Sequence, residues 1–264
     1  MMIAFVGKGG VGKTSISSAL ALNLSRHGKT AIVSSDFMSS LRHVFHDDPE
    51  GLKVIEMKEK EVAVAWKARY GSDVNTVLRQ FFKVDPWILD HIAESPGVAE
   101  EFMISNVVDL DNSGKYDYVV WDTAASSSTM HLLMLEKEFY EHLDRDVMLF
   151  LKLRDRFHAE KVLDLLEEWK SLSREVWRKL EETAFFLVTT QDELSLLQAV
   201  EIREDFARMG LNLRGTICNR CKEPAEGEFA LKVPEYHGTA REIVEQISKS
   251  PIESLLQRLE LHHA

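Results

Sequence analysis

The chain has 264 residues, of which 45% are apolar, and a formal net charge of -11 at pH 7. A chain of this length and apolar content can bury a large core, either as one α/β domain or as two small domains. A single domain is expected. The acidic balance disfavours a general attraction to nucleic acid or to anionic membrane surfaces. The longest uncharged apolar runs fall short of the roughly 18 to 20 residues that would span a bilayer, and the N-terminal run has no basic flank typical of a signal peptide. With only two cysteines, Cys218 and Cys221, a disulfide framework is excluded and a cytoplasmic location is expected.

The first half of the chain alternates apolar runs with helical periodicity. A strand is predicted at about 2–6, and after a glycine loop a helix runs through 14–28 and is closed by Gly28. A second strand covers 30–36 and leads through a short apolar stretch, 52–57, into a helical pattern from 59 to about 110 that breaks near Gly71, Pro86 and Pro96-Gly97. The third long strand is predicted at 116–122.

The second half continues the same alternation. A helical pattern over about 130–182 is followed by strands at 184–190 and 213–219, which flank a helix at 194–210 and so form a βαβ unit. A short strand at 229–234 and two helical pieces broken by Pro251 end the chain.

These elements predict an α/β fold with a mostly parallel sheet flanked by helices, because the strands are apolar almost throughout and alternate with helices. The expected organisation is a single domain, 1–264, with helical insertions after the second and third long strands at about 59–110 and 130–182. Ligands of such sheets bind at the carboxyl ends of the strands. Residues at four of these ends are therefore candidates for one crevice: Gly7, Asp36, Asp122 and Asn219.

The segment "GKGGVGKT", residues 7–14, lies between a strand and a helix and matches the phosphate-binding loop pattern G-x4-G-K-[ST]. Its backbone N–H groups and the helix N-terminus form a cradle for an anion. Lys13 is expected to contact the β and γ phosphates and the Thr14 hydroxyl to ligate Mg²⁺. The alternative is a glycine turn that only packs a helix on a strand. The predicted nucleotide-binding residues of the loop are Gly7, Gly9, Gly10, Val11, Gly12, Lys13, Thr14 and Ser15.

Two carboxylates follow predicted strands near this loop. Asp122 stands where P-loop proteins keep the aspartate that holds Mg²⁺, although an aspartate at a strand end can also cap the next helix. Asp36 ends the neighbouring strand and is a candidate to position or deprotonate the attacking water, with capping again the alternative. ATP and Mg²⁺ are accordingly the expected ligands.

The motifs resemble those of the arsenite-pump ATPases and their relatives that target tail-anchored membrane proteins, and the resemblance covers most of the chain. "KGGVGKT" is similar to the deviant Walker motif of the dimeric P-loop class to which this family belongs. In that class the early lysine, here Lys8, reaches across a homodimer to the phosphates bound by the partner. The resemblance therefore implies that Lys8 acts in catalysis together with Lys13 and Asp36, as an arginine finger does elsewhere.

Further segments resemble the switches of this family. In "SSDFMSSL" the residues Asp36, Ser40 and Leu41 match the first switch, but Phe37 and Met38 replace its proline and histidine. In "VVWDTAASSSTMHLL" the second switch is matched by Asp122, Thr123, Ala124 and Thr129, with three serines in place of proline, glycine and histidine. These substitutions are expected to leave the nucleotide chemistry intact and to affect how the nucleotide state is coupled to partner binding. "SPGVAEEF" resembles another family segment, and the resemblance implies adenine contacts at Asn219 and Pro234.

The resemblance implies a Mg²⁺- and ATP-dependent homodimeric switch whose leading role is to handle membrane-protein cargo. The helical patterns supply apolar, aromatic and methionine-rich faces, as in "VLRQFFKVDPWILDHI", which would suit an apolar protein segment, although such faces usually pack in a core. Transient membrane association stays open, whereas an integral membrane segment and a nucleic-acid partner are not expected.

Two alternatives remain. The first is a metal-cluster or metalloid-linked carrier. "CNRC" suggests the metal cluster, since two thiolates from each subunit could form a tetrahedral site, but the cysteines straddle Asn219 rather than follow it. The metalloid site of the family uses widely separated cysteines, and this chain has none outside "CNRC". A nucleotide-binding scaffold with little turnover is the other. The C-terminal "PIESLLQRLEL" lacks the basic face of a membrane-binding helix.

Overall fold

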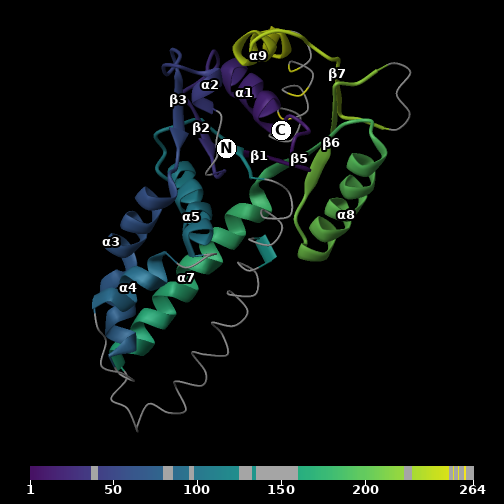
Figure 1. Ribbon diagram of the computed structural model, residues 1–264. Coiled ribbons are helices and arrows are strands. Elements are labelled where there is room, and N and C mark those ends of the chain that lie inside the picture. Colours follow the sequence, from purple (N-terminus) through teal and green to yellow (C-terminus); the bar gives the residue numbers. More distant parts are fainter. Residues whose placement is uncertain are drawn as a thin grey trace. The chain divides into compact units, whose positions relative to one another are not determined.

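The computed structural model describes residues 1–36, 41–79, 86–94, 98–124, 133–134, 160–222 and 228–249, together with Ile252, Leu255 and Leu259 (Figure 1). The chain divides into two compact units, one comprising 1–57, 107–130 and 181–264 and the other 58–106 and 131–180. The first unit contains the phosphate loop. The division into one domain with helical subregions at 59–110 and 130–182 stays a prediction.

The first unit is built on a seven-stranded sheet in the order β3-β2-β4-β1-β5-β6-β7. All its strand pairs are parallel, which confirms the predicted fold class. The strands are β1 (Met2–Val6), β2 (Thr30–Ser34), β3 (Leu52–Glu56), β4 (Tyr118–Asp122), β5 (Ala184–Thr189), β6 (Leu213–Asn219) and β7 (Leu231–Val233). From β1 the chain passes to β2 on one side of β1, and from β4 it passes to β5 on the other side. In parallel sheets such a reversal of strand order opens a crevice at the carboxyl ends of the strands, here at the end of β1.

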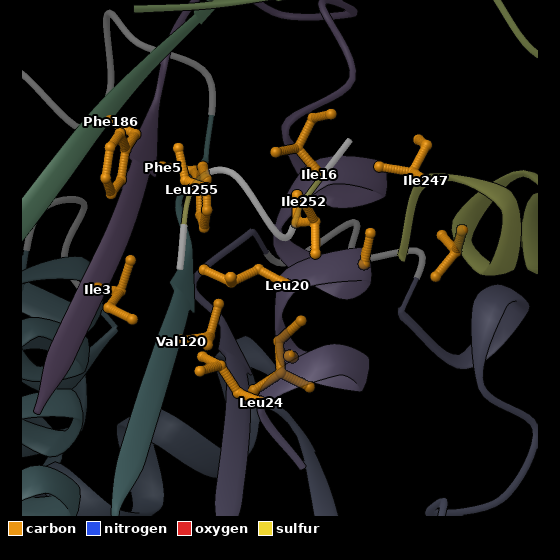
Figure 2. Packing of buried hydrophobic residues seen from close by; sticks show 14 of the residues in the cluster. Ile3, Phe5, Ile16, Leu20, Leu24, Val120, Phe186, Ile247, Ile252 and Leu255 are labelled. Carbon is orange, nitrogen blue, oxygen red and sulfur yellow. The ribbon is translucent and has the colours of Figure 1, made fainter. Parts of the chain in front are cut away.

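Helices cover both faces of this sheet. Phe186 belongs to the core cluster that also holds residues of α1 (Lys13–Leu24) and α9 (Ala240–Lys249), and Figure 2 shows Phe5 and Phe186 with Ile16, Leu20 and Ile247 in this core. Phe185 points to the opposite face because side chains alternate along a strand. There its ring lies 5.0 Å from that of Phe206 on α8 (Glu193–Met209). The unit therefore has three layers, with α1 and α9 on one face and α8 on the other.

The second unit consists of helices among its described residues. It contains α3 (Glu59–Leu78), α4 (Pro86–Ala93) and the greater parts of α5 (Val98–Asn112) and α7 (Glu160–Glu182). Gly71 was predicted to break the first of these helices, and this is wrong: α3 continues through it. A single glycine inside a helix costs about 1 kcal/mol relative to alanine, which the packing of a long helix can offset. Pro86, in contrast, begins α4, where its missing N–H is not needed.

Other parts of the predicted element assignment also differ from the structure. The first helix ends at Leu24 rather than at Gly28, because the N–H groups of Arg26 and His27 donate to carbonyls three residues back and tighten the chain into a turn. The strand predicted from residue 116 starts at Tyr118, since Asp117 instead contacts the backbone of Lys29. The stretch 52–57 was not assigned to the sheet, yet it forms the edge strand β3.

Candidate functional site

The phosphate loop takes its shape from two glycines whose backbone angles other residues rarely adopt. Gly7 has a φ of 149°, and a Cβ on it would lie 2.2 Å from the carbonyl oxygen of Val188 on β5. Gly12 has a φ of 94°, and a Cβ on it would lie 2.2 Å from Nδ2 of Asn219 on β6. The loop therefore passes so close to the ends of two neighbouring strands that only glycine fits at either position.

Lys13 is the first residue of α1, and its side chain turns back into the loop. Its Nζ donates hydrogen bonds to the carbonyl oxygens of Gly7, at 2.9 Å, and Lys8, at 3.3 Å. Burial lowers the pKa of Lys13, while the negative charges of Asp122 and Asp36 oppose this shift. The ammonium group is thus fixed inside the loop with two carboxylates near enough to act on it.

Asp122 ends β4 and contacts the residue after Lys13. Its Oδ2 accepts a hydrogen bond of 2.9 Å from the Thr14 hydroxyl, and only 2% of the residue is exposed. Burial raises the pKa of Asp122 to about 6, against the favourable effects of Thr14 and Lys13. The other oxygen, Oδ1, is buried and has no hydrogen-bond partner within the part of the chain that the structure describes.

The donor set at Asp122 fits Mg²⁺. A hard cation of this kind is bound by carboxylate and hydroxyl oxygens, and an unsatisfied buried carboxylate oxygen beside a threonine hydroxyl offers both. In P-loop proteins these are the two protein groups that hold the ion.

Asp36 follows β2 and is brought to the same edge of the sheet. Its N–H donates to the Ser34 hydroxyl at 3.2 Å, while the N–H of Ser35 donates to the carbonyl of Asp122 at 3.1 Å. The indole N–H of Trp121 also donates to the Ser35 hydroxyl, at 3.0 Å in the interior. The chain after β2 is therefore fastened to β4, and the charge of Asp36 affects the pKa of both Lys13 and Asp122.

Lys8 differs from Lys13 in its surroundings. Its side chain is 29% exposed and its Nζ lies 3.9 Å from Oδ1 of Asp192, an ion pair at the edge of the distance range. Asp192 is the N-cap of α8, where it accepts a hydrogen bond from the Ser195 N–H. Hydrogen bonds from the side chains of Ser195 and Thr190, together with this N–H, hold the pKa of the Asp192 carboxyl far below its usual range. Of the two lysines, one is thus committed to the loop and the other reaches toward the surface.

The remaining predicted residues are arranged around this centre. Asn219 is buried at the end of β6, and its Nδ2 donates to the Val11 carbonyl at 2.8 Å. Pro234 is exposed just after β7, and among the described residues no backbone hydrogen bond joins it to the loop. Gly9 and Gly10 are exposed, and Ser15 is partly buried on the first turn of α1. Ser40 and Thr129 of the predicted switches, and residues 95–97 of "SPGVAEEF", lie outside the described residues, whereas the rest of that segment begins α5.

Sequence reasoning missed several contacts that join strands and loops around the site. Thr123 donates to the carbonyl of Phe5 at 2.6 Å and so ties β4 to β1. Gln191 makes two hydrogen bonds with the backbone of Lys222, at 2.9 and 2.6 Å, joining the loops that follow β5 and β6. Asp192 could have been found, since an aspartate directly before an apolar-periodic run is a typical N-cap.

Comparison with known proteins decides the family. The sequence profile described as "Anion-transporting ATPase" matches residues 1–252. The chain belongs to this ATPase family. It is 29% identical to a protein of Aquifex aeolicus whose name places it among the arsenical pump-driving ATPases, over 85% of this chain and 82% of that protein. It is 24% identical to "ATPase GET3B" of Arabidopsis thaliana, over 84% of this chain and 64% of that protein.

A further relative of this ATPase, the "Arsenical pump-driving ATPase" of Acidiphilium multivorum, is 26% identical over 85% of the chain, but the chain spans only 40% of that protein. Family membership confirms the predicted resemblance, and with it nucleotide binding and ATP hydrolysis.

Two findings concern the other ligands and partners. Among the described residues, no helix combines the length and the apolar character needed to cross a membrane. In the same residues, no cluster of three or more His, Cys, Asp or Glu side chains forms a metal site, and Cys218 and Cys221 are both buried and form no disulfide. These findings leave the shared cysteine site between two subunits a hypothesis.

Proposed function

We propose that this ATPase is a Mg²⁺-dependent homodimeric switch of the cytoplasm with a deviant Walker loop. The observation that carries the proposal is the division of labour between the two loop lysines. Lys13 is buried and bound to loop carbonyls, whereas Lys8 is partly exposed and held by a distant ion pair with Asp192. Exposed ion pairs contribute little to stability, at most about 1 kcal/mol, so Lys8 can leave Asp192 at small cost. It is then available to the phosphates held by a second subunit.

Each residue of the site has a defined part in this proposal. Thr14 and Asp122 hold the Mg²⁺ ion, which neutralises charge on the phosphate oxygens when it is bound. Lys13 and the loop N–H groups bind the phosphates. Asp36 orients the attacking water and accepts its proton. Lys8 from the partner subunit stabilises the charge that develops as the γ-phosphoryl group leaves. Asn219 and Pro234 contact the adenine.

The role in handling membrane-protein cargo is supported by the helical unit. A cavity of about 250 Å³ lies between α3, α5 and α7. Its walls are largely apolar and rich in aromatic side chains, formed by Trp66, Tyr70, Val74, Val98, Phe102, Ser105, Trp169, Leu172, Ser173 and Val176. An apolar cavity with aromatic walls suits an apolar side chain or segment as occupant.

Three variants test the switch. Lys13→Ala is expected to abolish ATP binding. Asp36→Asn is expected to bind ATP with nearly normal affinity and to hydrolyse it very slowly. Lys8→Ala should lose both ATP-dependent dimerisation, measured by analytical ultracentrifugation, and most of the hydrolysis. A Lys8→Ala protein that stays monomeric with ATP but hydrolyses it at the wild-type rate would refute the proposed trans role.

The cargo is tested by trapping. The Asp36→Asn protein is purified from its own host in ATP, and the proteins that accompany it are identified by mass spectrometry. A partner with a C-terminal apolar segment is the expected result. Co-purification of a metal cluster would instead favour the carrier alternative, and normal turnover of Asp36→Asn would contradict the role assigned to that carboxylate.

A further inference from the structure

The end of β6 touches the phosphate loop through the buried side chain of Asn219. Asn219 is the last residue of β6 and is 5% exposed, and its Nδ2 donates to the carbonyl oxygen of Val11 at 2.8 Å. The same Nδ2 would lie 2.2 Å from a Cβ placed on Gly12. The carboxamide therefore lies directly against the peptide group that joins Val11 to Gly12.

The sheet holds Asn219 in this position from both sides. β5 lies between β1 and β6, with Val6 level with Leu187 and Thr189 level with Cys218. On the far side Asn219 is level with Val233 of β7, and the N–H of Cys221 donates to the Val233 carbonyl at 2.8 Å. The loop thus passes over the end of β5 and meets Asn219 beyond it. Because the sheet fixes the position of the Asn219 carboxamide, the hydrogen bond sets the conformation of the loop at Val11.

The geometry of a peptide group turns this contact into a constraint on a neighbouring donor. A trans peptide is planar, and its C=O and N–H point in opposite directions. Because the Val11 carbonyl is directed at Asn219, the N–H of Gly12 is directed away from β6. A phosphate loop binds its ligand through N–H groups that converge on the anion, so the orientation of each one affects affinity.

We propose that Asn219 is a positioning residue for phosphate binding: by holding the Val11 carbonyl, its carboxamide keeps the Gly12 N–H turned toward the bound phosphates. This role is separate from the adenine contact, which would use other atoms of the same carboxamide. It rests on the nucleotide site and requires neither the dimer nor the cargo.

The test compares a ligand that has a base with one that has none. Isothermal titration calorimetry with Mg²⁺ measures the affinity for ADP, which is not hydrolysed, and for inorganic tripolyphosphate, in the wild type and in Asn219→Ala. Loss of one buried hydrogen bond is expected to weaken tripolyphosphate by a factor of about 2 to 10, and ADP by at least as much, because ADP also loses the proposed adenine contact. If the side chain served only the base, ADP alone would weaken and tripolyphosphate would bind as before, and the proposal would be wrong. It would also be wrong if neither ligand weakened.

Two further variants make the outcome specific. Gln191→Ala removes another side-chain contact at this end of the sheet, the two hydrogen bonds of Gln191 with Lys222, and leaves Val11 untouched. It is expected to leave tripolyphosphate affinity unchanged, and an equal loss in both variants would show general loosening rather than positioning. Asn219→Ser keeps a donor on a shorter side chain and should bind tripolyphosphate better than Asn219→Ala.

Partial unfolding of an Asn219 variant does not affect the comparison between ADP and tripolyphosphate. Only folded molecules bind, and both ligands sample the same folded molecules, so the ratio of the two affinity losses is unaffected by the folded fraction. Failure of the wild type to bind tripolyphosphate would overturn both the phosphate loop assignment and this proposal. Failure of ATP to dimerise the protein would overturn the switch alone.

Discussion

Replacing Asp122 by asparagine is expected to make the nucleotide-free protein more stable at neutral pH, although it removes a residue needed for function. The carboxylate is 2% exposed, and its Oδ1 has no hydrogen-bond partner among the described residues. Burial raises its pKa to about 6 from an ordinary value of 3.8. The folded protein therefore holds the proton more tightly than the unfolded chain, and ionising Asp122 costs stability.

The pKa difference sets the size of this cost. A difference of about 2 units corresponds to about 3 kcal/mol at 1.36 kcal/mol for each unit. Because the folded pKa is the higher one, stability from this group is fully present below about pH 4 and is lost as pH rises through 6. Asparagine avoids the loss and can still accept the hydrogen bond from Thr14. Allowing for relaxation around the charge, the expected gain at pH 7.5 is about 1 to 3 kcal/mol, or roughly 2 to 10 °C in Tm for a chain of this size.

The assay is unfolding by urea, followed by circular dichroism at pH 7.5 and pH 5.0 without nucleotide or metal. The gap between Asp122→Asn and wild type should be large at pH 7.5 and should shrink at pH 5.0. Asp47→Asn, which changes an exposed aspartate, is the matched control and should match wild type at both values. Lower stability of Asp122→Asn at pH 7.5, or the same gap at both pH values, would refute the reasoning.

Three other substitutions test the loop and the core. Gly7→Ala puts a Cβ 2.2 Å from the Val188 carbonyl, so calorimetry should show loss of ADP binding and thermal unfolding a lower Tm. Phe206→Ala removes a ring that is 1% exposed and packs on Phe185, and urea unfolding should show a loss of about 3 to 5 kcal/mol. Asp192→Ala should lower the Tm by removing the N-cap of α8, whereas Asp192→Asn, which can still cap, should lower it less; equal effects would show that the charge matters instead.

The parts of the fold that could be predicted were those with a local signal. The apolar strands, the glycine loop and the helix 194–210 follow from periodicity and from residues such as Gly210, which ends α8 with a φ of 76°. The edge strand β3 gave no such signal, because its apolar run is short and its place depends on pairing with β2. Gly71 gave a false signal for a helix break. The cost of a glycine inside a helix can be outweighed by packing, and packing cannot be seen in the sequence.

The candidate site divides in the same way. Lys13, Thr14 and Asp122 were placed together because the spacing of a motif and the end of a strand fix them relative to one another. Thr14 does contact Asp122, and the charge of Asp122 acts on Lys13. The ion pair of Lys8 with Asp192 and the contact of Asn219 with Val11 join segments far apart in sequence. Such contacts depend on strand order and register, which a single sequence leaves open.

The electrostatics of the site explain why a triphosphate and a divalent cation would bind together. Burial lowers the pKa of Lys13 and raises that of Asp122, so at both positions the protein interior disfavours the charge that function requires. The two charges attract each other, and this attraction partly offsets the burial of each. A phosphate alone would compensate Lys13 while adding repulsion at Asp122, and a cation alone would do the reverse. When both ligands bind, the triphosphate brings negative charge to Lys13 and the cation brings positive charge to Asp122. Each ligand should therefore increase the affinity of the protein for the other.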